Sequence, residues 1–255
     1  MAELELPLSG HLEELRRRLG IAVVATLVAF ALCYPGSEFF FDLLTAPLFS
    51  AAEGMPEVKL IGTGVAEAFF TRLKVALVAA LFVALPVILY QLWLFILPAL
   101  RLGEIRYLRS FVFFGSMFFV AGGVFCYRVV FPVGLPFFLA EYSRIGIEPT
   151  LRISEYLSFT SRMLLAFGLT FEMPIATFFL ARMGLVTHVT LLQKGRYAVL
   201  VMFVVAAILT PPDAVSQMLM VLPLLLLYLL SIGVAWAFGR DRKADTDNSD
   251  TGNDD

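Results

Sequence analysis

The sequence predicts an all-α polytopic membrane protein with six transmembrane helices and with both termini on the cytoplasmic side. Of its 255 residues, 60% are hydrophobic and only 16% are charged, whereas a soluble domain has about 25% charged residues. The mean hydropathy is +0.86. The chain also contains long runs with almost no charge, each near the length of about 20 apolar residues that a spanning helix requires. These observations indicate an apolar surface that faces lipid.

Six runs with no charge, or with one, mark the expected spans. They are residues 19–37, 75–100, 110–127, 163–181, 197–210 and 214–238. The fifth run is short, at roughly 21 Å of helix. The fourth is interrupted only by Glu172. Pro86, Pro174 and Pro223 lie inside spans, where each removes a backbone hydrogen bond and is expected to bend its helix.

The positions of Lys and Arg predict the orientation. If both termini are cytoplasmic, every inner segment carries three positive charges close to a helix end, as the positive-inside rule requires. We therefore expect a cytoplasmic N-terminal segment (residues 1–18), a six-helix membrane domain (residues 19–238) and a disordered acidic cytoplasmic tail (residues 239–255). The acidic start of the chain is unlike a cleavable signal peptide, which begins with a basic region.

The two long outer loops are expected to contain short interfacial helices. Residues 38–68 and 132–158 are partly apolar and carry aromatic residues at helical spacing. Amphipathic segments of this kind lie at the membrane surface.

Two acidic positions on the inner side have both a plain and a functional interpretation. In HLEELRRRL, residues 11–19, Glu13 precedes Arg17 and Glu14 precedes Arg18 by four residues, so that both pairs can form along a helix. Glu104 stands among three arginines in the inner loop at residues 97–109. It can form a local ion pair, or it can accept an incoming guanidinium in a two-pronged contact that a lysine cannot reproduce.

Glu172 is the most costly residue in the predicted spans. A charged side chain at the centre of a spanning helix costs about 2.5–3.5 kcal/mol on insertion scales. We therefore expect Glu172 to face the interior of the bundle or a wet cavity. Two interpretations remain open, namely pairing with a neighbouring helix and participation in a binding groove or translocation path.

The sequence contains no signature of covalent chemistry. It has no HExxH or GxSxG motif, no paired intramembrane aspartates and no phosphate-binding loop, so no hydrolase or nucleotide-dependent enzyme is indicated. No basic patch interleaved with aromatic residues indicates nucleic-acid binding. We expect a protein that is not an enzyme, has no cofactor or metal and does not bind nucleic acid.

Several segments together resemble the TatC family, the multispanning subunit of the twin-arginine protein translocase. Besides HLEELRRRL, they are TAPL at 45–48, PVILYQLWLFILPAL at 86–100, AFGLTFEMP at 166–174 and LTPPDAVSQ at 209–217. They occur in the family's order and extend over almost the whole chain, which makes the resemblance more specific than any single motif.

The resemblance implies a receptor for twin-arginine signal peptides and the core scaffold of a translocase that exports folded proteins across the cytoplasmic (inner) membrane. It implies that Glu14 and Glu104 hold the two arginines, while Arg16 and Arg18 shape the N-terminal segment. It also implies a membrane groove in which Glu172 meets a polar residue of a partner helix, with Gln217 and Asp213 adding polar contacts. The residues given structural roles are Pro47, Phe95 and Pro98.

The resemblance further implies single-span partners of the TatA and TatB type and transport driven by the proton-motive force, with a homo-oligomer left open. The alternative is a proton-coupled small-solute transporter that uses Glu172 as its relay. Two observations count against it. The sequence shows no inverted repeat, and it offers no second intramembrane ionisable group to which a proton can pass.

Overall fold

The computed structural model describes residues 8–53, 58–96, 108–209 and 214–239. These residues form two compact units, which are described separately below. Unit 1 comprises residues 1–168 and unit 2 comprises residues 169–255. The expected acidic tail at 239–255 lies outside the described residues apart from Gly239, as do Pro98, Glu104 and Asp213.

Six helical segments of the described chain are long and apolar enough to cross a membrane, which confirms the predicted fold class. They are Leu12–Ala51, Glu67–Phe95, Leu108–Arg144, Ile153–Arg182, His188–Leu209 and Met220–Phe238. Each contains one of the apolar runs read from the sequence or most of it.

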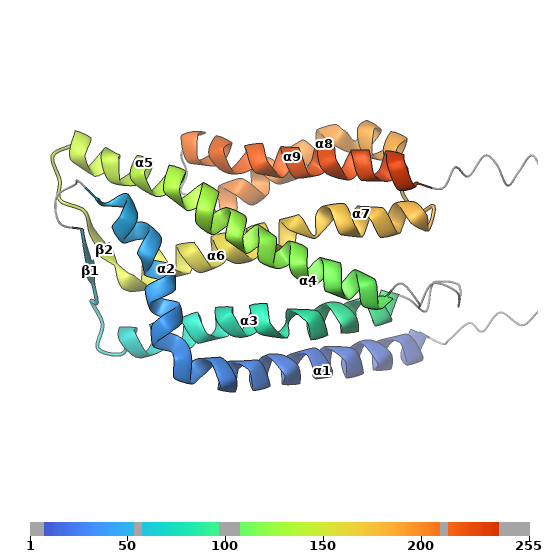
Figure 1. The fold of residues 1–255 in the computed structure, drawn as a ribbon, viewed down its shortest axis with the longest axis horizontal. Coiled ribbons are helices and arrows are strands. Elements are labelled where there is room, and N and C mark those ends of the chain that lie inside the picture. Colours follow the sequence, from blue (N-terminus) through green and yellow to red (C-terminus); the bar gives the residue numbers. More distant parts are fainter. Residues whose placement is uncertain (1–7, 54–57, 97–107, 210–213, 240–255) are drawn as a thin grey trace, which may run out of the picture. The chain divides into compact units, whose positions relative to one another are not determined.

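Unit 1 begins with two helices that pack along each other. The helix α1 (Leu8–Cys33) lies beside α3 (Glu67–Ile96) (Figure 1). Ala29 of α1 is buried with Ala80 and Ala84 of α3, and such small residues let two membrane helices approach closely. Residues 8–18 of the predicted N-terminal segment therefore belong to the same helix as the first span.

The next pair of helices in unit 1 meets at two glycines. These helices are α4 (Leu108–Phe125) and α6 (Ile153–Phe171). A Cβ atom on Gly122 would lie 2.5 Å from the carbonyl oxygen of Phe167, and a Cβ on Gly168 would lie 2.8 Å from the ring of Phe119. The ring of Phe119 also meets that of Phe82 edge to face, with 5.0 Å between centroids. Only glycine at these two positions allows α4 and α6 to pack this closely.

The two expected interfacial helices are both present as helices. They are α2 (Ser37–Ala51) and α5 (Phe131–Arg144). However, each continues from a spanning helix. The helix α2 follows α1 through the 3-10 turn Tyr34–Gly36, and α5 follows α4 through the π turn Cys126–Val130. Pro132 lies in the first turn of α5, where the missing N–H breaks no helical hydrogen bond, whereas Pro136 lies inside the helix.

Contacts between distant segments tie the loops of unit 1 together at the α2 end. The strand β1 (Lys59–Ile61) pairs in parallel with β2 (Thr150–Arg152). The Oε2 atom of Glu67 accepts hydrogen bonds from the backbone N–H groups of Thr63 and Gly64, and its Oε1 atom accepts one from Ser154 N–H at 3.2 Å. Through these bonds, the start of α3 is joined to the start of α6.

After the end of α6, the described part of unit 2 contains three helices, of which α9 contacts both others. They are α7 (Met173–Arg182), α8 (His188–Leu209) and α9 (Ala214–Phe238). The rings of Phe178 and Phe238 meet edge to face at 5.1 Å, and Tyr228 Oη donates to Leu191 O at 2.7 Å. The fifth span was expected to be short, at residues 197–210. This expectation is wrong for the length of the helix, because α8 begins at His188 and has 22 residues. Lys194 and Arg196 end the uncharged run without interrupting the helix.

Candidate functional site

The first turns of α1 present a half-buried carboxylate held by one arginine. Both Nε and Nη2 of Arg18 donate to Oε1 of Glu14, the former at 3.0 Å. The side chains are 13% exposed in Arg18 and 23% exposed in Glu14. This is one of the two pairs expected from the spacing. Glu13 and Arg17 are both exposed and form no ion pair within the described residues.

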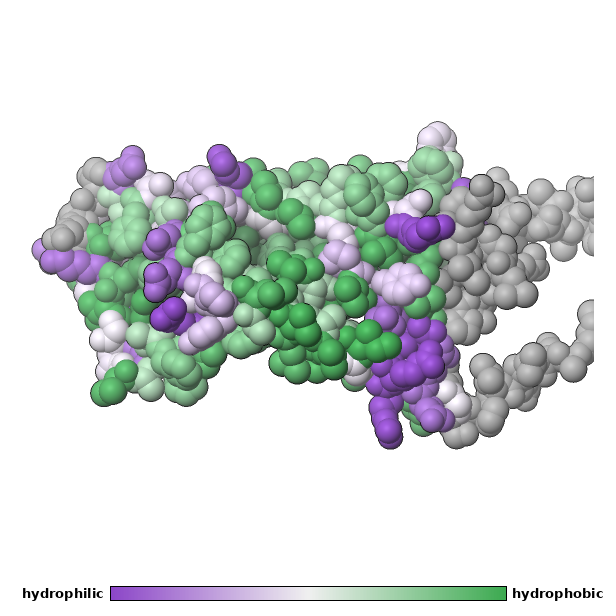
Figure 2. All heavy atoms as spheres, turned by 60° about the horizontal axis from the view of Figure 1, so that its bottom comes forward, coloured by the Kyte–Doolittle hydropathy of each residue, from purple (hydrophilic) through white to green (hydrophobic). Residues whose placement is uncertain are grey.

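The second oxygen of Glu14 remains available. Both donors of Arg18 go to Oε1, and Oε2 accepts no hydrogen bond from any described residue. A carboxylate has about four lone-pair sites, so that Glu14 can accept a further guanidinium without losing Arg18. Arg16 is exposed beside this pair and adds positive charge at the same end. Figure 2 shows hydrophilic residues gathered where α1 begins and an apolar surface over the rest of α1.

The end of α3 and the start of α4 lie at the end of unit 1 where α1 begins (Figure 1). The half-buried Phe95 is in the last turn of α3. Trp93 of α3 packs edge to face on Phe111 of α4, with 4.1 Å between ring centroids. The described residues therefore end at Ile96 and resume at Leu108 at the end of unit 1 where α1 begins. The residue expected to cooperate with Glu14, Glu104, falls within the intervening segment and outside the described residues.

Glu172 occupies a break in the fourth span. The helix α6 ends at Phe171 and α7 begins at Met173. Glu172 N–H donates to Leu169 O at 3.1 Å, and Glu172 O accepts from Ala176 N–H at 2.8 Å. The expected bend thus occurs just before Pro174, which lies in the first turn of α7 and lacks the N–H that would continue α6.

The carboxyl group of Glu172 is left without a partner. Its Oε1 atom is buried and makes no hydrogen bond within the described residues, and buried polar atoms in native structures nearly always have one. The side chain itself is half-buried. Within the described residues, Thr160 Oγ1 and Ser161 Oγ share this property.

Gln217 has an internal partner. Its Nε2 atom donates to Phe203 O at 3.0 Å, which joins α9 to α8. No hydrogen bond joins Gln217 to Glu172 in the described part of unit 2. That Glu172 and Gln217 line one groove stays a prediction, and Asp213, the third predicted groove residue, lies outside the described residues.

Pro47 is buried in α2, in keeping with the structural role expected for it. One turn earlier, Leu44 O accepts a hydrogen bond of 2.9 Å from Oη of the buried Tyr156. This bond ties α2 to α6 across 112 positions of sequence. Sequence reasoning missed Tyr156 as a structural residue.

Comparison with known proteins decides the family. The family model of the Sec-independent protein translocase protein TatC matches residues 10–223. The chain belongs to the TatC family. Among relatives named as TatC, the protein of Desulforapulum autotrophicum is 43% identical over 95% of this chain and 89% of its own length. The TatC of Magnetococcus marinus is 42% identical over 90% of this chain and 84% of its own length.

A solved structure agrees with this assignment. A crystal structure described as the twin arginine translocase receptor TatC matches with a TM-score of 0.80 and 36% identity, over 88% of this chain and 97% of that one. This TatC chain is therefore a multi-pass membrane protein of a protein translocase family. The relatives are named as translocase proteins and not as enzymes, and the solute-transporter alternative is not favoured.

Proposed function

We propose that this chain is the receptor for twin-arginine signal peptides and the core scaffold of a translocase for folded proteins. The observation that carries the proposal is the carboxylate oxygen of Glu14 that accepts no hydrogen bond from a described residue, held half-buried at the end of unit 1 where α3 ends and α4 begins. The proposal places both termini, and therefore this end, on the cytoplasmic side of the inner membrane, where a signal peptide arrives.

The chemistry of the pair explains why arginine is required. A guanidinium has five N–H donors in a planar fork, so that two of them can reach Oε2 of Glu14 together, as Nε and Nη2 of Arg18 reach Oε1. An ammonium group is a compact point charge and cannot make that contact. In the proposal, one arginine of the signal peptide binds Glu14 beside Arg18, and the second binds Glu104. Arg16 and Arg18 shape the N-terminal segment that carries Glu14.

A peptide titration tests the assignment. The detergent-solubilised full chain is titrated with a fluorescent signal peptide carrying Arg-Arg and with its Lys-Lys variant. We expect the Arg-Arg peptide to bind much more tightly, and either Glu14→Gln or Glu104→Ala to remove most of the difference. Each lost charge-assisted contact should cost about 1.5–3 kcal/mol, or roughly tenfold or more in affinity.

Glu13→Gln is the matched control for this titration. Glu13 is adjacent to Glu14 and carries the same charge, but it is exposed and unpaired, so its removal should leave the preference intact. Equal affinity for the two peptides contradicts the proposal. So does an equal loss in Glu13→Gln and Glu14→Gln, because negative charge alone would then explain binding.

The same proposal assigns Glu172 to partner binding. Its Oε1 atom is buried and has no partner among the described residues. In the proposal, this atom accepts a hydrogen bond from a polar side chain on the single helix of a TatA- or TatB-type protein. Because a bare carboxyl group inside a membrane is costly, the contact stabilises both helices. Transport itself would draw on the proton-motive force and on assembly with such helices, since the sequence holds no nucleotide-binding loop.

Two substitutions separate partner binding from proton transfer. Glu172→Gln keeps a hydrogen-bonding group and should preserve co-purification with the partner, whereas Glu172→Leu should weaken it. If Gln abolishes transport as fully as Leu does while the partner still co-purifies, a proton-carrying role for Glu172 replaces the assignment.

A further inference from the structure

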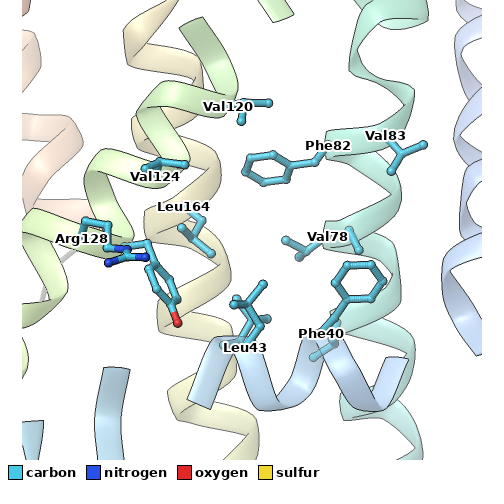
Figure 3. Close-up of a pocket in the computed structure, with 14 residues that line it drawn as sticks. Phe40, Leu43, Val78, Phe82, Val83, Val120, Val124, Arg128 and Leu164 are labelled. Atoms are coloured by element: carbon cyan, nitrogen blue, oxygen red, sulfur yellow. The ribbon is translucent and has the colours of Figure 1, made fainter. Parts of the chain in front are cut away.

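A cavity of about 440 Å³ lies in unit 1 between α2, α3, α4 and α6. Fourteen residues line it, nearly all of them apolar, and Arg128 is the one charged residue among these fourteen. Figure 3 shows Phe82, Val78 and Val120 pointing into the space between α3 and α4. Phe40 and Leu43 of α2 lie at one end of it, and Arg128 lies on the α4 side toward that same end.

The position of Arg128 along its helix places it at a headgroup level. Residues 110–127 carry no charge, and Arg109 and Arg128 bracket them. From Leu108 to Arg128 the helix rises roughly 30 Å at 1.5 Å per residue, which equals the hydrocarbon thickness of a bilayer. If Leu108 marks one surface of the hydrocarbon, Arg128 lies at the opposite one, in the leaflet on the α2 side.

Arg128 has no counter-charge of its own. It is exposed and makes no ion pair or hydrogen bond with any residue that the structure describes. The arginines on the same side of unit 1 differ in this respect, since Arg144 pairs with Glu141 and Arg152 pairs with Glu155. An unpaired guanidinium at the end of an apolar cavity is complementary to a molecule with an anionic head and an apolar tail.

The dimensions favour an acyl chain over a protein helix. One turn of α-helix with its side chains, about 10–12 Å wide and 5.4 Å long, already fills roughly the whole cavity. Water is also unfavourable, because apolar cavities stay dry unless polar groups hold the water. The volume does lie in the range of about 300–1,000 Å³ that is usual for small-molecule sites.

We propose that this cavity binds one phospholipid from the leaflet on the α2 side. The acyl chain lies between Val78, Phe82 and Val120, and the phosphate is bound by the guanidinium of Arg128. A guanidinium matches two phosphate oxygens at once. The hydroxyl group of Tyr127, which also lines the cavity, is the second polar group within the lining and can donate to the phosphate.

Native mass spectrometry of the full chain in dodecyl maltoside tests the proposal. The protein is titrated with palmitoyl-oleoyl phosphatidylglycerol, and in a second arm with dioleoylglycerol, which has the chains but no phosphate. We expect one phospholipid to bind with clearly higher affinity than further ones, and dioleoylglycerol to bind more weakly. Arg128→Gln should weaken the first phospholipid roughly tenfold or more, the scale of a lost charge-assisted contact.

Arg162→Gln is the matched control, because Arg162 is likewise exposed on a spanning helix but does not line the cavity. The affinity of the Arg162→Gln variant for the first phospholipid should equal that of the unsubstituted chain. Ala79→Phe fills the cavity and should also lower binding; if it does not fold, the two arginine variants decide. Equal binding by Arg128→Gln and the unsubstituted chain overturns the proposal, as does equal loss in both arginine variants or equal binding of dioleoylglycerol. No signal peptide enters the assay, so its outcome is independent of the receptor proposal.

Discussion

The glycine contact between α4 and α6 predicts that Gly122→Ala destabilises the membrane domain. The new Cβ would lie 2.5 Å from Phe167 O and 2.9 Å from Gly168 Cα, whereas ordinary contact begins near 3.4 Å. Both neighbours are backbone atoms of α6, so neither can turn away. The two helices must therefore separate by about 0.9 Å at this point, the difference between 3.4 and 2.5 Å.

Two opposing contributions set the size of the effect. Overpacking a well-packed core costs typically about 1–3 kcal/mol. Alanine in a helix interior is favoured over glycine by about 1 kcal/mol. We therefore expect a net loss of up to about 2 kcal/mol. Gly20→Ala provides the control, because a Cβ at this exposed position in α1 meets no atom within 4 Å, and it should raise stability slightly.

The measurement is the apparent Tm of each purified variant in detergent, followed by tryptophan fluorescence, since Trp93 is buried in unit 1. A change of 1 kcal/mol corresponds to about 2–4 °C for a domain of this size. Gly122→Ala should therefore unfold several degrees below Gly20→Ala. If the two variants show the same Tm, or if Gly122→Ala is the more stable, the helices do not meet at Gly122 as described.

Two further substitutions test contacts that join distant segments. Tyr156→Phe removes the hydrogen bond to Leu44 O and should lower the free energy of unfolding by about 1 kcal/mol, with unchanged affinity for the Arg-Arg peptide; a loss of peptide affinity with unchanged Tm contradicts a purely structural role. Gln217→Leu removes the hydrogen bond to Phe203 O and should lower the Tm by no more than Tyr156→Phe does. Because that bond is internal, partner proteins should still co-purify with Gln217→Leu, and their loss at unchanged Tm would assign Gln217 to the partner contact instead.

The features that the sequence predicts well depend on local patterns. Each apolar run by itself predicts a helix, because a spanning segment must satisfy its backbone hydrogen bonds within itself. The break at Glu172 follows from Pro174 in the same way. The pair Glu14–Arg18 is likewise a local consequence of spacing along one helix. None of these requires knowledge of how distant segments pack.

The features that sequence reasoning missed depend on packing between segments. The pairing of β1 with β2 joins residues that are about 90 positions apart, and nothing in KLI or TLR alone predicts it. The continuation of α4 into α5 was missed because Arg128 and Pro132 look like the end of a span, although a π turn and a proline in the first helical turn accommodate both. The cavity beside Arg128 is a space between four helices, which no single segment encodes.

The three proposed binding sites differ from the α2 end of unit 1 in how their polar groups are satisfied. At the α2 end, Glu67 and Tyr156 are fully engaged with backbone groups of other segments, so they stabilise the fold and offer nothing to a partner. Glu14, Glu172 and Arg128 each keep a charged or polar atom without a described partner. In our proposals, each of the three receives its partner from outside the chain. The three proposed partners differ in chemistry: a guanidinium for Glu14, a hydrogen-bond donor on a helix for Glu172 and a phosphate for Arg128. Substitution of one should therefore leave binding at the other two intact.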